Sequence, residues 1–170
     1  VVRDDPQRLF IETHTGRRYS YAQMDELAAR IAAALAASHV VPGDRVAAQV
    51  DKSPEAVALY LACMQLGAAF VPLNTAYTLV ELEYFLQDAE PRVAVVKPQS
   101  ADSVAAFAPR CGVGNVATLD DRGGGSLILP VSKRTASRSF WSIRHSPPPS
   151  SSNQRTICMI GSPRWTSNWE

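Results

Sequence analysis

Few side chains in this sequence have the type and spacing that catalysis or metal binding needs. His14, His39 and His145 lie far apart, and none is spaced with Cys, Asp or Glu as metal ligands on a helix are, so we expect surface or capping roles. Glu81 and Glu83 are close in sequence, but on a helix these two positions point in different directions. We therefore do not expect a catalytic carboxylate pair.

The cysteines point to a reducing compartment. Cys63, Cys111 and Cys158 are widely separated, which matches neither a disulfide framework nor the close pairs of zinc sites. Cys63 lies in an apolar, helix-like segment, where a thiol is expected to be buried and unreactive. These features predict a cytoplasmic protein.

Two further segments resemble ligand sites. Gly123-Gly124-Gly125-Ser126 is the nearest candidate for a phosphate-binding loop, but the next lysine is Lys133 and no helix start follows, so we favour a linker. Asn74, Thr75 and Tyr77 follow a predicted strand end, where open α/β sheets tend to bind ligands. We expect turn formation and packing there, because fold alone does not assign function.

The composition changes near Ile128. Residues 1–125 carry 11 Lys/Arg and 15 Asp/Glu, whereas residues 126–170 carry 6 and 1, and all three tryptophans lie in the second part. The formal net charge is only +1, so no global field favours nucleic acid or acidic lipid. The sequence has no 18-residue apolar run and no secretory signal pattern. We therefore expect neither a nucleic-acid partner nor a membrane span.

The first half of the chain predicts a hairpin and a capped helix. Residues 8–12 and 18–21 are short β-prone runs around Gly16, which can take the positive φ of a tight connection. Ser20 and Gln23 form a capping box at the start of a helix that ends before Pro42-Gly43. Its apolar stripe has helical spacing, and its members are Met24, Leu27, Ile31 and Leu35.

Strands and helices then alternate. Residues 44–50 predict a buried strand, and Ser53-Pro54-Glu55 supplies an N-cap, a first-turn proline and an acid against the positive end of a helix that stops at Gly67. A strand over 69–73 precedes a helix reaching Ala89, which has a Thr78–Glu81 capping box and a Tyr77–Leu82 hydrophobic staple. Strands over 92–97 and 116–119, with a short helix over 104–108, complete the pattern. Such alternation predicts a mostly parallel sheet with flanking helices.

Several runs together resemble the beginning of the AMP-forming acyl-CoA synthetases. They are Pro42-Gly43-Asp44-Arg45-Val46, Lys52-Ser53-Pro54-Glu55, Tyr60-Leu61-Ala62-Cys63, residues 67–78 (GAAFVPLNTAYT) and residues 81–91 (ELEYFLQDAEP). The resemblance covers about residues 8–128 and is particularly similar to bacterial malonyl-CoA synthetases. It implies the N-terminal part of the adenylate-forming α/β fold. It also implies a parent enzyme that uses ATP, magnesium and CoA to convert malonate or a related carboxylic acid to its acyl-CoA, through an acyl-adenylate.

The groups that this family uses for that reaction are not found in the matching segment. Its Ser/Thr/Gly-rich phosphate loop with a lysine would be expected shortly after residue 128, where the composition changes, and neither its metal-binding acid nor its C-terminal lysine is recognisable. We therefore expect no catalytic, cofactor-binding or metal-ligating residue in this chain. The hypothesis is an N-terminal fragment of an acid–CoA ligase, with a partial AMP-binding domain over 1–128 and a basic Ser/Pro-rich tail over 129–170.

The tail has three competing interpretations. A translated frameshift would explain the simultaneous loss of alanine and acids and is favoured over a natural disordered linker or a basic, proline-rich recognition segment. The alternative for the whole chain is a non-catalytic α/β interaction module whose tail recruits a partner. An organised tail pattern would distinguish this module, and none is evident in the sequence.

Overall fold

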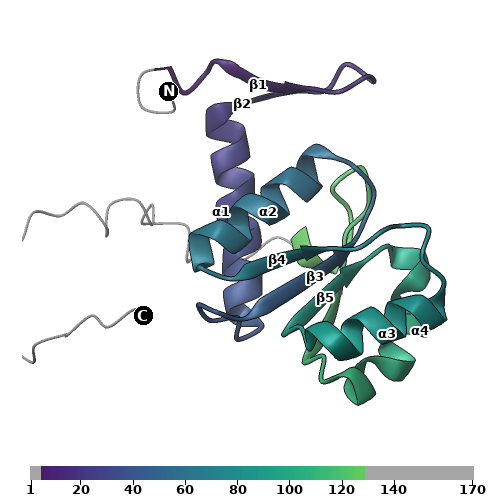
Figure 1. The fold of residues 1–170 in the computed structure, drawn as a ribbon. Helices are drawn as coiled ribbons and strands as arrows, with labels where there is room; N and C mark the ends of the chain where they lie inside the picture. Colours follow the sequence, from purple (N-terminus) through teal and green to yellow (C-terminus); the bar gives the residue numbers. More distant parts are fainter. Residues whose placement is uncertain (1–4, 129–170) are drawn as a thin grey trace, which may run out of the picture. The chain divides into compact units, whose positions relative to one another are not determined.

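Alternating strands and helices build residues 5–128, the part of the chain that the computed structural model describes (Figure 1). A separate hairpin comes first. Strands β1 (Leu9–Glu12) and β2 (Arg18–Ser20) pair antiparallel, and their connection contains Gly16 at a φ of +79°. The predicted hairpin and the predicted role of its glycine are confirmed.

Helix α1 (Tyr21–Ala37) begins with the predicted capping box. The Gln23 backbone N–H donates to Ser20 Oγ, and the Ser20 N–H donates to Gln23 Oε1 at 2.8 Å. The predicted apolar stripe is buried throughout: Met24, Leu27, Ile31 and Leu35. After the helix, His39 adopts a left-handed φ of 61° and is exposed, in agreement with a capping role.

Four parallel strands form the main sheet in the order β4-β3-β5-β6. These strands are β3 (Arg45–Gln49), β4 (Ala69–Pro72), β5 (Val93–Val96) and β6 (Asn115–Thr118). The two inner strands are short, apolar and almost wholly buried, as expected for strands covered on both faces. The predicted parallel α/β sheet is confirmed.

Three helices connect the strands: α2 (Pro54–Leu66), α3 (Leu79–Ala89) and α4 (Ala101–Phe107). Short 3₁₀ turns η1 (Pro98–Ser100), η2 (Ala108–Cys111) and η3 (Ser126–Ile128) supplement them. The predicted caps are present, since Ser53 Oγ accepts from the Ala56 N–H and Gly67 ends α2 at a φ of 70°. Thr78 and Glu81 form the second capping box.

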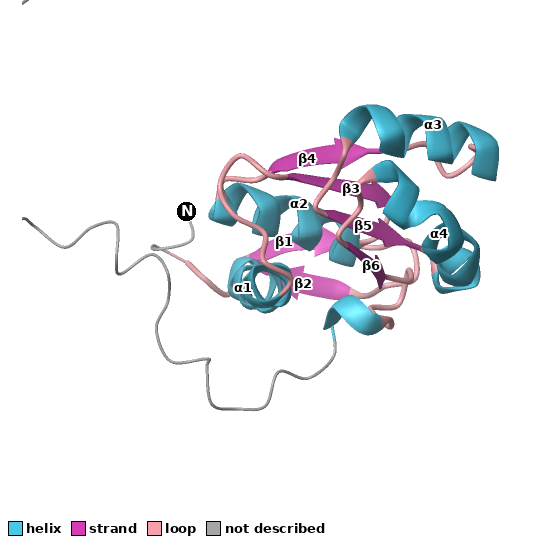
Figure 2. Ribbon diagram, turned by 90° about the horizontal axis from the view of Figure 1, so that it is seen from below, coloured by secondary structure: helices cyan, strands magenta, loops and turns pink. Residues whose placement is uncertain are grey.

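Alternate residues of the strands supply two hydrophobic cores, one on each face of the sheet. Val93 and Val95 of β5 join a core with residues of α1 and α2, while Ala94 and Val96 join a core with residues of α3 and α4. Figure 2 shows these two pairs of helices on opposite sides of the four strands. The two-residue period of a strand therefore ties both cores to a single chain segment.

Helix α2 leaves several of its larger apolar side chains at least partly exposed. Val57 and Met64 are 37% and 58% exposed, and Leu61 is only partly buried. The buried face is made of smaller side chains together with one leucine: Ala58, Leu59, Ala62 and Cys63. Small side chains allow α2 to lie close to α1 and to the sheet.

Within residues 5–128, no helix has the length and apolar character needed to cross a membrane. Several sequence-based predictions lie outside the described residues. They concern His145, Cys158, Lys133 and the interpretation of the tail over 129–170.

Candidate functional site

The carboxyl edge of the parallel sheet is the part of this fold where a ligand site is most expected. The chain passes from β3 to β4 through α2 on one face, then crosses to β5 through α3 on the other. Strand order reverses between β3 and β5, and open α/β sheets bind ligands beyond the carboxyl ends of strands at such a point. The loops that follow β3, β4, β5 and β6 therefore form the candidate site.

A buried glutamine fixes the loop after β4. Gln49, the last residue of β3, is 6% exposed, and its Nε2 donates to the carbonyl oxygens of Asn74 and Tyr77 at 3.0 and 3.3 Å. Asn74 Oδ1 accepts from the Ala76 N–H, and the Tyr77 ring stacks on Phe85 with centroids 4.7 Å apart. These contacts form a packed turn, which is the interpretation favoured from the sequence for Asn74, Thr75 and Tyr77.

An ion pair spans the reversal point itself. Lys97 Nζ, just after β5, lies 2.7 Å from Asp51 Oδ1, just after β3, and the two side chains are 30% and 48% exposed. At this exposure, such a pair contributes little to stability. Its chemical effect is that the lysine charge is already compensated, so an anion at this edge would have to compete with Asp51.

The glycine-rich turn after β6 is folded around its own carboxylate. Asp120 Oδ1 accepts from the backbone N–H groups of Arg122 and Gly124 at 2.8 and 2.7 Å, and these bonds hold the pKa of Asp120 below its usual range. Ser126 Oγ accepts from the Thr118 N–H at 2.9 Å. A Cβ on Gly125 would collide with the Thr118 carbonyl. An internal carboxylate therefore occupies two backbone N–H groups of the kind that a phosphate-binding nest offers.

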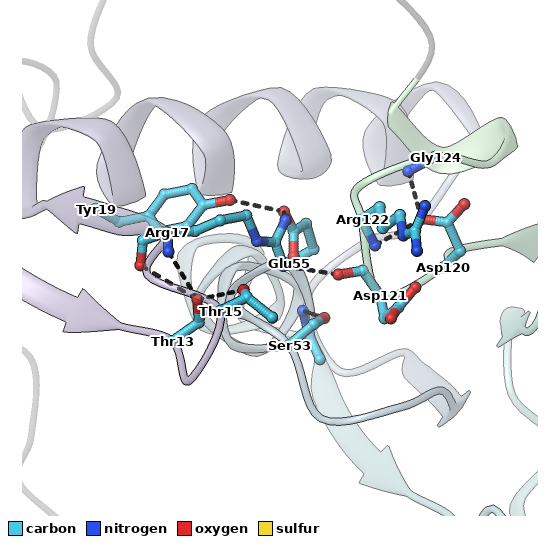
Figure 3. A network of polar contacts seen from close by, with 11 residues as sticks. Thr13, Thr15, Arg17, Tyr19, Ser53, Glu55, Asp120, Asp121, Arg122 and Gly124 are labelled. Atoms are coloured by element: carbon cyan, nitrogen blue, oxygen red, sulfur yellow. Dashed lines mark hydrogen bonds and ion pairs between the residues drawn. The ribbon is translucent and has the colours of Figure 1, made fainter.

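A second polar cluster surrounds Glu55 at the start of α2 (Figure 3). Glu55 Oε1 accepts from Arg17 Nη1 at 3.2 Å and from the Tyr19 hydroxyl at 3.0 Å, both on the hairpin. Arg17 Nη2 also donates to the Asp121 carbonyl at 2.7 Å. The Glu55 carboxylate and the Arg17 guanidinium together connect the hairpin, the start of α2 and the turn after β6.

Burial increases the energetic importance of this cluster. The Glu55 side chain is 5% exposed and that of Arg17 is 36% exposed. Burial, and then the hydrogen bond to Glu55 and its negative charge, raise the pKa of Tyr19. Within residues 5–128, Glu55 Oε2 is a buried oxygen without a hydrogen-bond partner. A buried carboxylate with one oxygen satisfied depends strongly on the partners it has.

The remaining candidates have structural roles. Cys63 is fully buried, and burial raises its pKa to about 11, which agrees with an unreactive thiol. Glu81 caps α3, and its bonds to Thr78 lower its pKa. Glu83 instead pairs with Arg110 at 2.9 Å. Among the described residues, no three His, Cys, Asp or Glu side chains lie close enough together to hold a metal ion.

Sequence reasoning missed the Glu55 cluster and the Asp51–Lys97 pair. A negative charge in the first turn of a helix is favourable by itself, so nothing in the sequence suggested a partner for Glu55. That partner, Arg17, lies 38 residues earlier. For Asp51 and Lys97 the only sequence signal was that opposite charges follow two predicted strands directly; that these strands are neighbours is known from the sheet order.

Comparison with known proteins decides the family. A family model described as AMP-binding enzyme matches residues 1–160. The chain belongs to the AMP-binding enzyme family. The match includes the sheet edge and the Glu55 cluster, and it confirms the resemblance noted in the sequence.

Several solved and curated relatives give the assignment more detail. MatB from Rhodopseudomonas palustris has 50% sequence identity and a TM-score of 0.70, covering 73% of this chain and 24% of that chain. A feruloyl-CoA synthase from Amycolatopsis is 40% identical over 95 residues, or 56% of this chain and 19% of that protein. The long-chain-fatty-acid–CoA ligase FadD13 from Mycobacterium tuberculosis is 36% identical over 98 residues, or 58% of this chain and 20% of the ligase. The chain thus spans about a fifth to a quarter of the length of these relatives.

Proposed function

We propose that this chain is an N-terminal portion of an acid–CoA ligase of the malonyl-CoA synthetase type. The parent reaction joins a carboxylic acid to CoA and converts ATP to AMP and pyrophosphate. The single observation that carries the proposal is the 50% identity to MatB over 73% of the chain. The feruloyl-CoA and long-chain-fatty-acid–CoA relatives support the broader class of acid–CoA ligases.

The proposed substrate is malonate or a related small carboxylic acid, and the proposed cofactors of the parent are ATP, magnesium and CoA. An ATP-bound form of MatB is among the similar structures, which supports the nucleotide. The proposed compartment is the cytoplasm, and the free thiols of Cys63 and Cys111 support a reducing environment.

We further propose that residues 1–128 act as a scaffold and carry no catalytic, cofactor-binding or metal-ligating group. Two observations support this division. The N–H nest of the glycine turn is filled by Asp120, and Lys97 is paired with Asp51. Groups that bind phosphate in this family would then come from other parts of the parent enzyme.

Residues 129–170 are proposed to be a separate tail, with a shifted reading frame as the favoured origin. The family match extends to residue 160, past the predicted boundary at 128. The nucleotide sequence of the gene tests directly whether the reading frame changes there. A shifted frame that spells a Ser/Thr/Gly loop and lysine after the codon for Ile128 would support the proposal. A coding sequence in which neither shifted frame spells that loop and lysine would overturn it.

An enzymatic experiment tests the scaffold proposal. Purified chain with ATP, magnesium, malonate and CoA should form no malonyl-CoA, whereas a MatB chimera carrying residues 5–128 in place of its matching segment should form it. The control is the same chimera with Leu59→Asp, which places a charge in a fully buried position and should be inactive. Thioester formation by the isolated chain, or a folded but inactive chimera, would contradict the proposal.

A further inference from the structure

Two segments that lie far apart in the sequence meet at a single buried carboxylate. The β1–β2 hairpin bonds to it through Arg17 and Tyr19. The turn over 120–126 lies beside it at Gly123 and bonds to the same Arg17 through the Asp121 carbonyl. The hairpin is a separate two-stranded sheet, not an extension of the main sheet. Two-stranded hairpins are marginal alone, so this one depends on what it docks against.

The turn packs closely against Glu55 and is also linked to it through Arg17. Gly123 has a φ of +83°, and a Cβ built there would lie 3.1 Å from Glu55 Oε1. The Arg17 guanidinium donates with Nη1 to the carboxylate and with Nη2 to the Asp121 carbonyl. A planar guanidinium holds two acceptors in fixed directions, so Glu55 and Asp121 constrain each other through it.

We propose that Glu55 is a coupling residue, through which the hairpin and the 120–126 turn stabilise each other across about 100 residues of sequence. Loosening either segment then loosens the other, because an energetic coupling between two sites is reciprocal. The inference concerns this chain's own residues and does not depend on the proposed function.

Hydrogen exchange of the full chain, followed by mass spectrometry, tests the coupling from both sides. Tyr19→Phe removes the hydroxyl bond from the hairpin to Glu55 and leaves the bond to the Asp121 carbonyl in place, and it should speed exchange of amides 122–126 severalfold. Asp120→Ala loosens the turn without touching Glu55 and should speed exchange at residues 17–20. Glu55→Gln should speed both, while the amides of β5 stay unchanged.

Two further variants keep the test decisive. Arg18→Ala is the matched control, because Arg18 lies beside Tyr19 but pairs with exposed Glu12 at 3.6 Å, and it should leave the turn unchanged. Gly123→Ala crowds Glu55 without removing a polar group and should speed exchange in the hairpin. Effects that stay within the substituted segment would overturn the proposal, as would an equal effect of Arg18→Ala. If a variant unfolds entirely, seen as fast exchange in β5, the remaining variants decide the outcome.

Discussion

Gly67 and Glu90 both follow the end of a helix in the left-handed backbone region, with φ values of 70° and 41°. Only glycine occupies this region without a steric penalty from Cβ. At Gly67, an added Cβ would also lie 3.4 Å from Pro42 Cβ. The two positions are therefore expected to respond in opposite ways to substitution.

Gly67→Ala should lower the free energy of unfolding by about 1–2 kcal/mol, the cost of a left-handed Cβ. Glu90→Gly should raise it by up to about 1 kcal/mol, because relief of strain exceeds the added freedom of the unfolded chain. The exposed pair of Glu90 with Arg45, at 3.9 Å, contributes little. Urea unfolding followed by circular dichroism measures both changes. A stabilising Gly67→Ala would contradict the assignment of strain.

Cys63 supplies a prediction with a pH dependence. Its pKa of about 11 lies above the ordinary 9.0, so the unfolded state releases this proton first and the thiol lowers the free energy of unfolding as pH rises above 9. At pH 9 the native thiol remains protonated and should resist iodoacetamide, whereas in urea it should react readily. Peptide mass spectrometry gives the extent of alkylation, and rapid labelling in native buffer would refute the expectation.

At the scale of single elements, three helices begin with a side chain that bonds to a free backbone N–H: Ser20, Ser53 and Thr78. Helix α4 begins differently, because Ser100 occupies the cap position without such a bond. Two serines at equivalent positions therefore differ in one hydrogen bond, which makes them a matched pair.

Ser20→Ala should reduce the free energy of unfolding by about 1 kcal/mol, the usual contribution of an N-cap hydrogen bond. Ser100→Ala should change the free energy of unfolding by only about a few tenths of a kcal/mol, since no cap bond is lost. Thermal and urea unfolding of the two variants give the comparison. Equal losses would show that the helix start of α1 does not depend on its cap.

The elements were predictable from sequence because their signals are local. Ser20 with Gln23, and Ser53 with Pro54, lie within one turn of the helices that they start. The Glu55 cluster was not predictable in this way, because Arg17 and Asp121 are 104 residues apart and only the fold brings them together. Similarly, the order β4-β3-β5-β6, which brings Asp51 and Lys97 together, is a property of the whole sheet.

At the scale of the whole described unit, β5 joins the two cores, since its four residues alternate between them. A substitution that destabilises either core is therefore expected to destabilise the other as well. A domain of this size has a net free energy of unfolding of only about 5–15 kcal/mol. Removing one large core side chain therefore removes a substantial fraction of that free energy.

Leu59→Ala, in the core shared by α1 and α2, should cost about 2–5 kcal/mol, because it removes buried methyl groups and leaves a cavity. Exchange in α3 and α4, on the opposite face, should rise together with exchange in α1. Val80→Ala is the control, since Val80 is 79% exposed, and it should have almost no effect. Loosening of α1 alone, with α3 and α4 unchanged, would mean that the two faces unfold independently.

The contact between Arg17 and the Asp121 carbonyl also sets an order of events during translation. The ribosome makes the hairpin early, but the acceptor for one half of the Arg17 guanidinium is synthesised 104 residues later. Until that point the Arg17 guanidinium can bond only to Glu55, which lies 38 residues after it. The hairpin then acquires its last partner only when the turn after β6 has left the ribosome, so its docking marks the completion of this unit.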